Sequence, residues 1–399
     1  MKAIVIGGNF AGMTAALELK RKLGKEVEVT VIDKSPVFLF IPSLIWVPFH
    51  RREVKDISIR RDEIFRKKNV NFVMAEAISV DPDAQLVHTS KGDFEYDHLV
   101  VATGPKVDFN AVPGLKEHGF YIGTPEGAMR IRKHLDAFVK NPGPIVIGAT
   151  QNAGCMGAAY EFLFNMDAWL RSQKIRKKVE LTWVTPETYI GHFGIDGMTG
   201  AETMLTGFLK MFNIKFRKET AIKEVREKEV ELDSGEILPS DFTMLMPPFI
   251  GVDMIRNSPA LRGTKAGYLP VADTYRHPDY PNVWAAGIAV DVKPPFEAGK
   301  VPFSAPKTGY PSDETAKIAA ENIVRVYKGK GKLKAKSWGD IPAICVMDAG
   351  NKEVIILGNK LFRPRGFAVM IPNLLGDVNK VLFEKYFLWK TRHGYSFLP

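Results

Sequence analysis

Residues 144–162, PIVIGATQNAGCMGAAYEF, decide the fold of this chain. The stretch consists of an apolar strand, a glycine-rich turn and a helix, which is the order that opens a βαβ dinucleotide-binding unit. Thr150 stands where the fingerprint has a further glycine, so the backbone amides of the turn cannot approach a pyrophosphate closely. We therefore predict a Rossmann-like unit whose phosphate site is degraded.

Cys155 lies at the head of the same helix. A helix N-terminus lowers the pKa of a thiol and favours the thiolate, which is the reactive form. This position predicts a redox-active cysteine presented to a cofactor that is bound elsewhere. The alternative is a buried cysteine that fills a small gap in the core, which is the commoner role of a lone cysteine. The stretch by itself leaves both interpretations open.

Another unit of this kind is predicted at the N-terminus. Residues 2–6 are a continuous apolar strand, GGNFAG follows at 7–12, and the strand at 26–32 leads into an acid about 20 residues beyond the loop. A carboxylate at this point accepts ribose hydroxyl groups, so we expect the adenosine and pyrophosphate of FAD here. The residues expected to contact FAD in this unit are Gly7, Asn9, Phe10, Ala11, Gly12, Asp33 and Lys34.

Three later stretches are predicted to return the chain to the cofactor. YDHLVVATGP at 96–105 is an apolar strand ending in ATG, a motif of flavoproteins with two dinucleotide domains, and YPNVWAAGIAV (280–290) and APKTGY (305–310) follow. Lys307 is placed to stabilise an anionic reduced flavin, or else it is a solvated lysine. The remaining residues expected to contact FAD are Pro42, Ala77, Ala102, Thr103, Gly104, Gly287, Ile288, Lys307 and Gly309.

The predicted fold class is α/β, with two Rossmann-like (FAD/NAD(P)-binding type) domains and a small C-terminal region. Residues 1–111 and 274–330 are expected to form the FAD-binding domain, and residues 112–273 the second, degenerate domain with Cys155. Residues 331–399 carry Cys345 and end in an aromatic and basic segment. We expect this segment to be an amphipathic helix that lies on anionic lipid.

The composition of the chain limits the kinds of partner that it is expected to bind. The net charge of +10 and the sequence pI near 9.3 favour anionic partners, above all a membrane surface. No zinc-finger spacing or RNA-binding aromatic motif is present, so neither nucleic acid nor a metal ion is expected. The two cysteines do not indicate a disulfide-stapled secreted scaffold. No apolar run reaches ~18 residues and a strand begins at once, so we expect no transmembrane segment and no signal peptide. The choice between monomer and homo-oligomer stays open.

Taken together, these stretches resemble the sulfide:quinone oxidoreductases, a group of flavoproteins in the disulfide-reductase-like superfamily. The resemblance spans nearly the whole chain and rests on GGNFAG, FLFIPS, ATGPK, the Cys155 stretch, YIGHFGI, AAGIAV, APKTGY, AICVMDAG and FEKYF. It implies that Cys155 and Cys345 flank the flavin and carry sulfur. It further implies proton-handling roles for Glu161 and His192, and quinone contacts for Phe40, Phe383 and Tyr386.

The resemblance also implies a reaction, the FAD-dependent oxidation of sulfide to polysulfide or sulfur. Sulfide attacks a disulfide or trisulfide that joins the two cysteines, which leaves a persulfide on one and a thiolate on the other. The thiolate, which we assign to Cys345, passes two electrons to FAD, and a membrane quinone takes them from the flavin. The protein would then be attached peripherally to the membrane.

The chain departs from the family pattern at one place. Members often have a third cysteine, followed shortly by a histidine, before the second Rossmann strand. The matching stretch, FYIGTPEGA at 120–128, has Gly123 and Gly127 at those positions. A thioether from a third cysteine to the flavin is excluded on this alignment, so we expect FAD to be bound noncovalently.

Four alternatives stay open. A type II NADH:quinone oxidoreductase would share the fold but would need a working second nucleotide turn. A flavocytochrome c-type sulfide dehydrogenase would pass electrons to a heme subunit, a partner that calls for export. A coenzyme A-disulfide or thioredoxin-type reductase would need CxxC or CxxxxC, which the chain lacks. A flavin-binding sensor would bind FAD without turning over sulfide.

Overall fold

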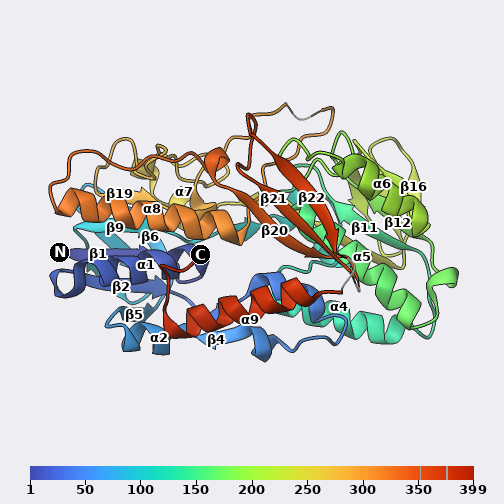
Figure 1. The fold of residues 1–399 in the computed structure, drawn as a ribbon, viewed down its shortest axis with the longest axis horizontal. Coiled ribbons are helices and arrows are strands. Elements are labelled where there is room, and N and C mark those ends of the chain that lie inside the picture. Colours follow the sequence, from blue (N-terminus) through green and yellow to red (C-terminus); the bar gives the residue numbers. More distant parts are fainter. Residues whose placement is uncertain (298, 351, 374–375) are drawn as a thin grey trace.

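The computed structural model describes residues 1–297, 299–350, 352–373 and 376–399. Two sheet-containing units lie side by side along the long axis, and the C-terminal strands and helix lie across them (Figure 1). Both predicted Rossmann-like sheets are present, which confirms the predicted α/β fold class. The domain boundaries at residues 111, 273 and 330 stay predictions.

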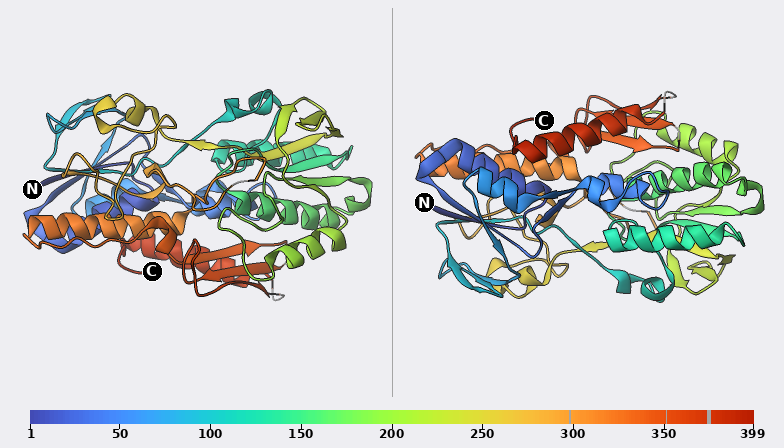
Figure 2. Two further views of the ribbon diagram at one scale, coloured as in Figure 1. Left: turned by 90° about the horizontal axis from the view of Figure 1, so that it is seen from above. Right: turned by 90° about the horizontal axis from the view of Figure 1, so that it is seen from below.

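The first unit is built on a parallel five-stranded sheet in the order β19-β9-β1-β2-β5. Its central strands are continuous apolar runs because both faces of the sheet are covered. Figure 2 shows α8 on one side of this sheet, in contact with α1, and the antiparallel meander β6-β7-β8 on the other. The bounds are β1 (Lys2–Ile6), α1 (Phe10–Leu23), β2 (Glu28–Asp33), β5 (Asn71–Met74), β6 (Ala77–Asp81), β7 (Leu86–Thr89), β8 (Gly92–Glu95), β9 (His98–Val101), β19 (Val283–Ala285) and α8 (Gly309–Tyr327).

A short hairpin-like pair interrupts the connection from β2 to β5. Strand β3 (Val37–Leu39) pairs antiparallel with β4 (Ser58–Arg60), and helix α2 (Arg61–Lys67) follows at once. Helix α2 cannot begin before Arg61, because the three residues before it are used in strand pairing. Phe38 of β3 therefore packs on Phe10 of the first unit, whereas the following 3-10 helix, Ile41–Trp46, contacts α4 (Pro125–Phe138) and α5 (Met156–Ser172) of the second unit.

The second unit has a parallel four-stranded sheet in the order β13-β12-β11-β17. A two-stranded ribbon, β10 with β18, connects it to the first unit. A second meander, β14-β15-β16, completes it. The bounds are β10 (Lys106–Val107), α3 (Leu115–His118), α4 (Pro125–Phe138), β11 (Ile145–Ala149), α5 (Met156–Ser172), β12 (Leu181–Val184), α6 (Ala201–Met211), β13 (Lys215–Arg217), β14 (Ile222–Val225), β15 (Glu229–Leu232), β16 (Ile237–Pro239), β17 (Phe242–Met246), β18 (Phe249–Ile250) and α7 (Asp253–Arg256).

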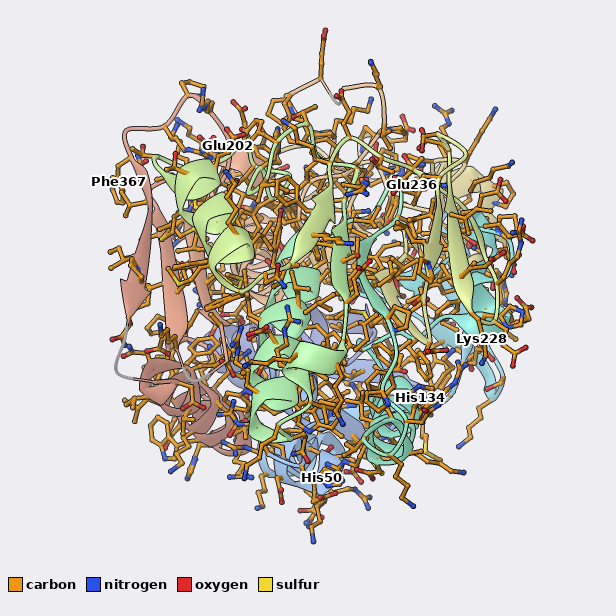
Figure 3. The ribbon with its side chains drawn as sticks, turned by 90° about the vertical axis from the view of Figure 1, so that its right-hand side faces the viewer. His50, His134, Glu202, Lys228, Glu236 and Phe367 are labelled. Carbon is orange, nitrogen blue, oxygen red and sulfur yellow. The ribbon has the colours of Figure 1, made fainter. Side chains whose placement is uncertain are left out.

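The C-terminal region is an antiparallel sheet followed by a helix. Strands β20 (Ala343–Asp348), β21 (Glu353–Gly358) and β22 (Ala368–Asn373) pair in chain order, and α9 (Val378–His393) follows. Strand β20 packs on α5 of the second unit, and α9 contacts both β20 and α2 of the first unit. Figure 3 shows the sheet beside α6, with Phe367 and Glu202 on the same side of the molecule and Lys228 and Glu236 on the other. This region therefore joins the two units at the cysteine helix.

Candidate active site

The glycine-rich turn of the first unit has no room for side chains. A Cβ atom on Gly12 would lie 1.8 Å from the carbonyl oxygen of Gly7, and one on Gly7 would lie 2.4 Å from that of Ala102. Gly7 also has a φ of +94°, a conformation that favours glycine. The turn is therefore packed closely against the end of β9, and it presents the N-terminus of α1, an end that attracts phosphate.

Asp33 ends β2 beside this turn. Its carboxylate accepts hydrogen bonds from the amide of Gly8 (2.7 Å) and from Nη2 of Arg61 (2.8 Å). Arg61 is only 3% exposed, and the sequence analysis missed it because a run of basic residues does not indicate which one is buried. Lys34 lies exposed, 3.5 Å from Glu76. The ribose contact of Asp33 stays a prediction.

The three stretches GGNFAG, AAGIAV and APKTGY meet at the N-termini of α1 and α8. A Cβ atom on Gly287 would lie 2.8 Å from Cβ of Ala11 and 3.3 Å from the side chain of Ser312. One on Gly309 would lie 3.3 Å from the ring of Phe10. Because two helix N-termini and two tightly packed glycines converge here, the residues present fit a dinucleotide cofactor such as FAD.

The other residues predicted to contact FAD lie on connecting segments of the first unit. Asn9 precedes α1, and its side-chain oxygen accepts the amide of Leu39 at 3.4 Å. Pro42 is in a short 3-10 helix, Ile41–Trp46, and Ala77 begins β6. The residues that follow a strand of the sheet are Ala102, Thr103 and Gly104 after β9, and Ile288 after β19. Their contacts with FAD stay predictions.

Lys307 lies beside the cysteine turn of the second unit. Its amide donates to the carbonyl oxygen of Gly154 at 2.9 Å, and its ammonium lies 3.4 Å from the centre of the Tyr268 ring. Burial lowers the pKa of Lys307 to about 7, and the nearby Asp291 opposes this shift. The side chain is thus held against protein, and its role beside a reduced flavin stays a prediction.

Cys345 faces the helix that follows Cys155. Its neighbours on the same face of β20, Ala343 and Met347, are buried against α5, whereas Cys345 itself is exposed. Cys345 thus keeps contact with solvent, although protein atoms surround its thiol closely enough to desolvate the thiolate. Cys155 is close enough to raise the pKa of the Cys345 thiol. Both cysteines are free thiols in this structure.

The pKa of each thiol is raised. Burial raises the pKa of Cys155, although the backbone of Ala158 at the start of α5 acts in the opposite direction. The prediction of a lowered pKa for Cys155 is therefore wrong, because desolvation of the thiolate outweighs the helix end. Burial and then the Glu161 carboxylate raise the pKa of Cys345 to about 12, while Lys380 opposes them.

Glu161 lies close to both cysteines, since it raises the pKa of each. Its Oε1 accepts a hydrogen bond from the amide of Asp348 at 2.9 Å and forms an ion pair with Lys380 of α9. Burial raises the pKa of Glu161, and Lys380 opposes this shift. A buried carboxyl beside two thiols, with its own ammonium partner, can take up and release protons. The sequence analysis missed Lys380.

Helix α9 buries charged groups and exposes apolar ones. Besides Lys380, Glu384 pairs with Arg52 at 3.0 Å, and Lys390 lies 3.6 Å from Asp313. The amphipathic pattern expected for this helix is therefore wrong, because charged and apolar side chains are found both buried and exposed, whereas its contact with anionic lipid stays a prediction. Each charge can be buried because it has a partner. The exposed apolar side chains of α9 are Val378, Leu382, Phe383 and Trp389.

His192 lies in an aromatic enclosure. Its ring centre is 4.8 Å from that of Phe296 and 4.8 Å from that of Phe303, and its side chain is 4% exposed. Burial lowers the pKa of His192 to about 4, so the ring is neutral near pH 7, and its Nδ1 has no hydrogen-bond partner among the described residues. The segments that carry it also pack on the cysteine helix, but its proton-handling role stays a prediction.

The predicted quinone contacts divide into two groups. Phe40 lies 6.0 Å from Phe383 and 5.1 Å from Phe387, measured between ring centres, and Phe387 also lies 5.2 Å from Phe10. Tyr386 points elsewhere, since its hydroxyl donates to the carbonyl oxygen of the last residue at 3.1 Å. The ring that shares the cluster with Phe383 is therefore Phe387, and helical i, i+4 spacing is the signal that could have found it.

The second glycine-rich turn is covered by the chain itself. The amide of Asn152 donates to the carbonyl oxygen of Pro302 at 2.6 Å, and that of Ser304 donates to the carbonyl oxygen of Ala153 at 3.1 Å. Residues 302–304 thus occupy the turn where a nicotinamide dinucleotide would place its pyrophosphate. This contact supports the predicted degradation of the second phosphate site.

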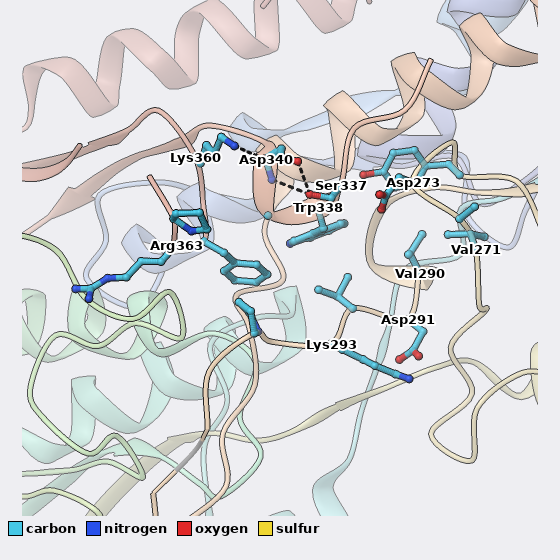
Figure 4. A pocket seen from close by; sticks show the side chains of 17 residues that line it. Val271, Asp273, Val290, Asp291, Lys293, Ser337, Trp338, Asp340, Lys360 and Arg363 are labelled. Atoms are coloured by element: carbon cyan, nitrogen blue, oxygen red, sulfur yellow. Dashed lines mark hydrogen bonds and ion pairs between the residues drawn. The ribbon is translucent and has the colours of Figure 1, made fainter. Parts of the chain in front are cut away.

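A cavity of about 380 Å³ lies between the C-terminal region and residues 271–295 (Figure 4). Asp291, Lys293, Trp338, Asp340 and Lys360 are among the residues that line it, whereas neither cysteine does. Acidic and basic side chains are mixed around it. The cavity is therefore separate from the two cysteines.

Similarity to known proteins agrees with this geometry. Residues 1–302 match the family model described as pyridine nucleotide-disulphide oxidoreductase. The sulfide-quinone reductase of Aquifex aeolicus is 32% identical over 397 residues, which are 98% of this chain and 91% of that protein. The chain belongs to the sulfide-quinone reductase family. It is therefore an oxidoreductase, and the cofactor of this family is FAD.

Solved structures agree with this assignment. The X-ray structure of the sulfide:quinone oxidoreductase from Aquifex aeolicus has a TM-score of 0.94 and covers 98% of this chain and 92% of that chain, at 32% identity. The NDH2 structure from Plasmodium falciparum in complex with NADH has a TM-score of 0.75 at 14% identity and covers 99% of this chain and 96% of that chain. At this identity the likeness shows a common fold alone. Within the described part of the chain, no helix is long and apolar enough to cross a membrane.

Proposed function

We propose that this protein oxidises sulfide and passes the electrons through FAD to a membrane quinone. The observation that supports this best is the grouping of Cys155, Cys345 and Glu161, with Lys380 as the partner of the carboxylate. Two thiols on separate elements beside a proton acceptor suit thiol–disulfide chemistry. The same reaction is named for the Aquifex aeolicus relative.

FAD would be held by the glycine turn with Asp33 and by the convergence of α1 and α8 around Gly287. When bound, FAD supplies the two-electron acceptor for the cysteine pair. Lys307 would hold positive charge near the anion that would develop on reduction of the flavin. Because burial lowers the pKa of Lys307 to about 7, the protonation of its amine would depend on this nearby negative charge. Gly123 and Gly127 leave no room for larger residues, because a Cβ atom on either would lie 2.1 Å from Tyr121. This supports a noncovalent cofactor.

The cysteine chemistry starts from a disulfide between Cys155 and Cys345. HS⁻ attacks Sγ of Cys155, the S–S bond breaks, and a persulfide on Cys155 and a thiolate on Cys345 result. Joining of this thiolate and the persulfide as a trisulfide would release one proton and the two electrons that a bound FAD would accept. Glu161 takes this proton, since its raised pKa suits it to that task. His192, neutral and buried, is a second candidate for holding a proton.

The proposed membrane contact has its own apolar surface. The outer face of the β20–β22 sheet consists of aliphatic side chains that are exposed or half-exposed, namely Ile344, Val346, Ile355, Leu357, Val369 and Ile371. Leu382 (58% exposed) and Phe383 (41% exposed) of α9 are further exposed apolar residues in this region. We propose that this surface sits on the bilayer, with the positive net charge of the chain favouring anionic lipid.

Substitution of the cysteines tests the chemistry. Cys155→Ser and Cys345→Ser, each loaded with FAD and mixed anaerobically with sulfide, should keep their yellow colour, because the sulfur relay needs both thiols. Val346→Ala, on the outer face of the same strand as Cys345, should bleach like the unaltered protein. Normal bleaching by either serine variant would refute the proposed cysteine chemistry.

Vesicle binding tests the membrane surface. Leu382→Glu should weaken flotation with vesicles of phosphatidylglycerol and phosphatidylcholine, because it places a negative charge in the apolar surface. Ile237→Glu, at a side chain that is 51% exposed on the distant strand β16, is the matched control and should not. Equal flotation of both variants would contradict this orientation.

A further inference from the structure

Glu187 is a buried carboxylate that the reaction above does not use. It follows β12, near the strand end where dinucleotide-binding units place their ribose-binding acid. Its side chain is 0% exposed and turns inward. It accepts hydrogen bonds from the hydroxyl of Tyr160 (2.7 Å), the hydroxyl of Thr185 (2.8 Å) and the amide of Phe193 (2.7 Å). One carboxylate thus joins α5, the end of β12 and the loop that carries His192.

The same network holds both neighbours of His192. The amide of Phe193 donates to Glu187, and the amide of Gly191 donates to the hydroxyl of Tyr160 at 3.1 Å. Tyr160 directly precedes Glu161 on α5, so the His192 loop is attached one residue away from the carboxylate that faces the cysteines. A Cβ atom on Gly194 would lie 3.3 Å from the side chain of Met156, the residue after Cys155.

No lysine or arginine in the described part of the chain forms an ion pair with Glu187. Burial raises the pKa of Glu187 to about 7, and its three hydrogen-bond donors, together with the backbone of His192, oppose the shift. The titratable groups around it stay neutral near pH 7, because the pKa of Tyr160 is raised well above its usual value, that of Tyr189 is raised to about 12 and that of His192 is lowered to about 4. Neutral donors alone therefore stabilise the charge on Glu187.

We propose that Glu187 is a positioning residue for sulfide oxidation, whose ionised carboxylate fixes the His192 loop on the cysteine helix and releases it on protonation. The mechanism follows from the donors. Both hydroxyl groups donate to Oε2, so a proton on that oxygen displaces at least one of them. The loop then loses part of its attachment at low pH. The role in catalysis rests on the proposed function, whereas the attachment of the loop does not.

Hydrogen exchange tests the attachment without sulfide. In the FAD-loaded protein, amides of residues 189–197 should lose protection by about tenfold as the pH falls from 8 to 6, after correction for intrinsic exchange. Glu187→Gln should have low protection at both pH values. Asp167→Asn is the control, because it removes a buried carboxylate of α5 that is paired with Arg171 and Arg176. In this variant the protection of residues 189–197 should depend on pH as in the unaltered protein.

Thr185→Val gives a milder second test. It removes one donor, so the ionised form of Glu187 is less stabilised and the loss of protection should move to higher pH, by about one pH unit. A midpoint that does not move in Thr185→Val, or protection in Glu187→Gln that still follows pH as in the unaltered protein, would overturn the proposal.

Flavin reduction then links the loop to catalysis. Rates of anaerobic bleaching, expressed per HS⁻ concentration to remove the ionisation of sulfide, should fall below pH 7 in the unaltered protein. In Glu187→Gln they should be about tenfold lower and should lack the part of this fall that the titration of Glu187 causes, while the titration of Glu161 remains. Rates that keep the original pH profile in this variant would refute the catalytic role. If sulfide bleaches no variant, the proposed function has failed, and hydrogen exchange still decides whether Glu187 holds the loop.

Discussion

Replacing Lys380 with methionine removes the ammonium that faces the Glu161 carboxylate. The side chains of Lys380 and Glu161 are 3% and 12% exposed, so the carboxylate would be left in a site where water screens it little. Its remaining partner is the amide of Asp348. Breaking a buried pair in this way costs about 3–5 kcal/mol, which is on the order of 10² to 10⁴ in the ratio of folded to unfolded protein.

The loss of folding stability in Lys380→Met should grow as the pH rises. Lys380 normally lowers the pKa of Glu161, which burial raises, so its removal raises the folded-state pKa further above the unfolded value. A group with a raised folded-state pKa favours folding below its unfolded pKa and loses that contribution as pH rises through the folded-state pKa. The loss of stability in Lys380→Met should therefore be largest at pH 8 and shrink toward pH 5.

Urea unfolding of FAD-saturated protein, followed by circular dichroism at pH 5, 6.5 and 8, measures this effect. The double variant Glu161→Gln with Lys380→Met should recover most of the loss, because it removes both charges. Lys215→Met is the matched control at a surface pair, since Lys215 and Glu180 are 57% and 46% exposed, and it should cost about 1 kcal/mol or less. The reasoning would be refuted if Lys380→Met lost only about 1 kcal/mol of stability at pH 8. It would also be refuted if the loss in this variant were the same at pH 5 as at pH 8.

Three further predictions concern the cofactor and its partners. Acid precipitation should release all of the yellow colour into solution, because Gly123 and Gly127 offer no thioether to the flavin; colour retained in the pellet would contradict this. NADH should fail to bleach the flavin, because residues 302–304 cover the second turn, and rapid bleaching would show that this segment moves aside. Phe383→Ala should raise the KM for a quinone analogue severalfold while sulfide-driven bleaching stays unchanged, with the exposed Phe397→Ala as control; equal KM values would remove Phe383 from the quinone site.

The sequence predicted the elements whose signals are local. The strand before Gly148, the crowded turns at Gly7 and Gly12, and the approach of AAGIAV to α1 all follow from hydrophobic runs and from glycines that have no room for a Cβ atom. The pairing of Cys155 with Cys345 came from family resemblance, because nothing local in either stretch indicates the other.

The buried charges could not be predicted in the same way. Arg61, Glu187 and Lys380 lie in stretches where charged residues are normally solvated, and only tertiary packing supplies their partners. The same cause reversed two expectations, since burial raises the pKa of Cys155 despite the helix end, and α9 buries Lys380, Glu384 and Lys390 while it leaves apolar side chains exposed. Periodicity places residues on a face of a helix, but it does not show which face is covered by oppositely charged neighbours.

The most direct test of sulfide oxidation coupled to quinone reduction is an anaerobic titration of the yellow protein with sulfide, followed by a quinone analogue, with flavin absorbance as the readout. The account predicts that sulfide bleaches the flavin and that the quinone restores its absorbance. Absorbance that sulfide leaves unchanged, or a bleached flavin that the quinone fails to reoxidise, would contradict it.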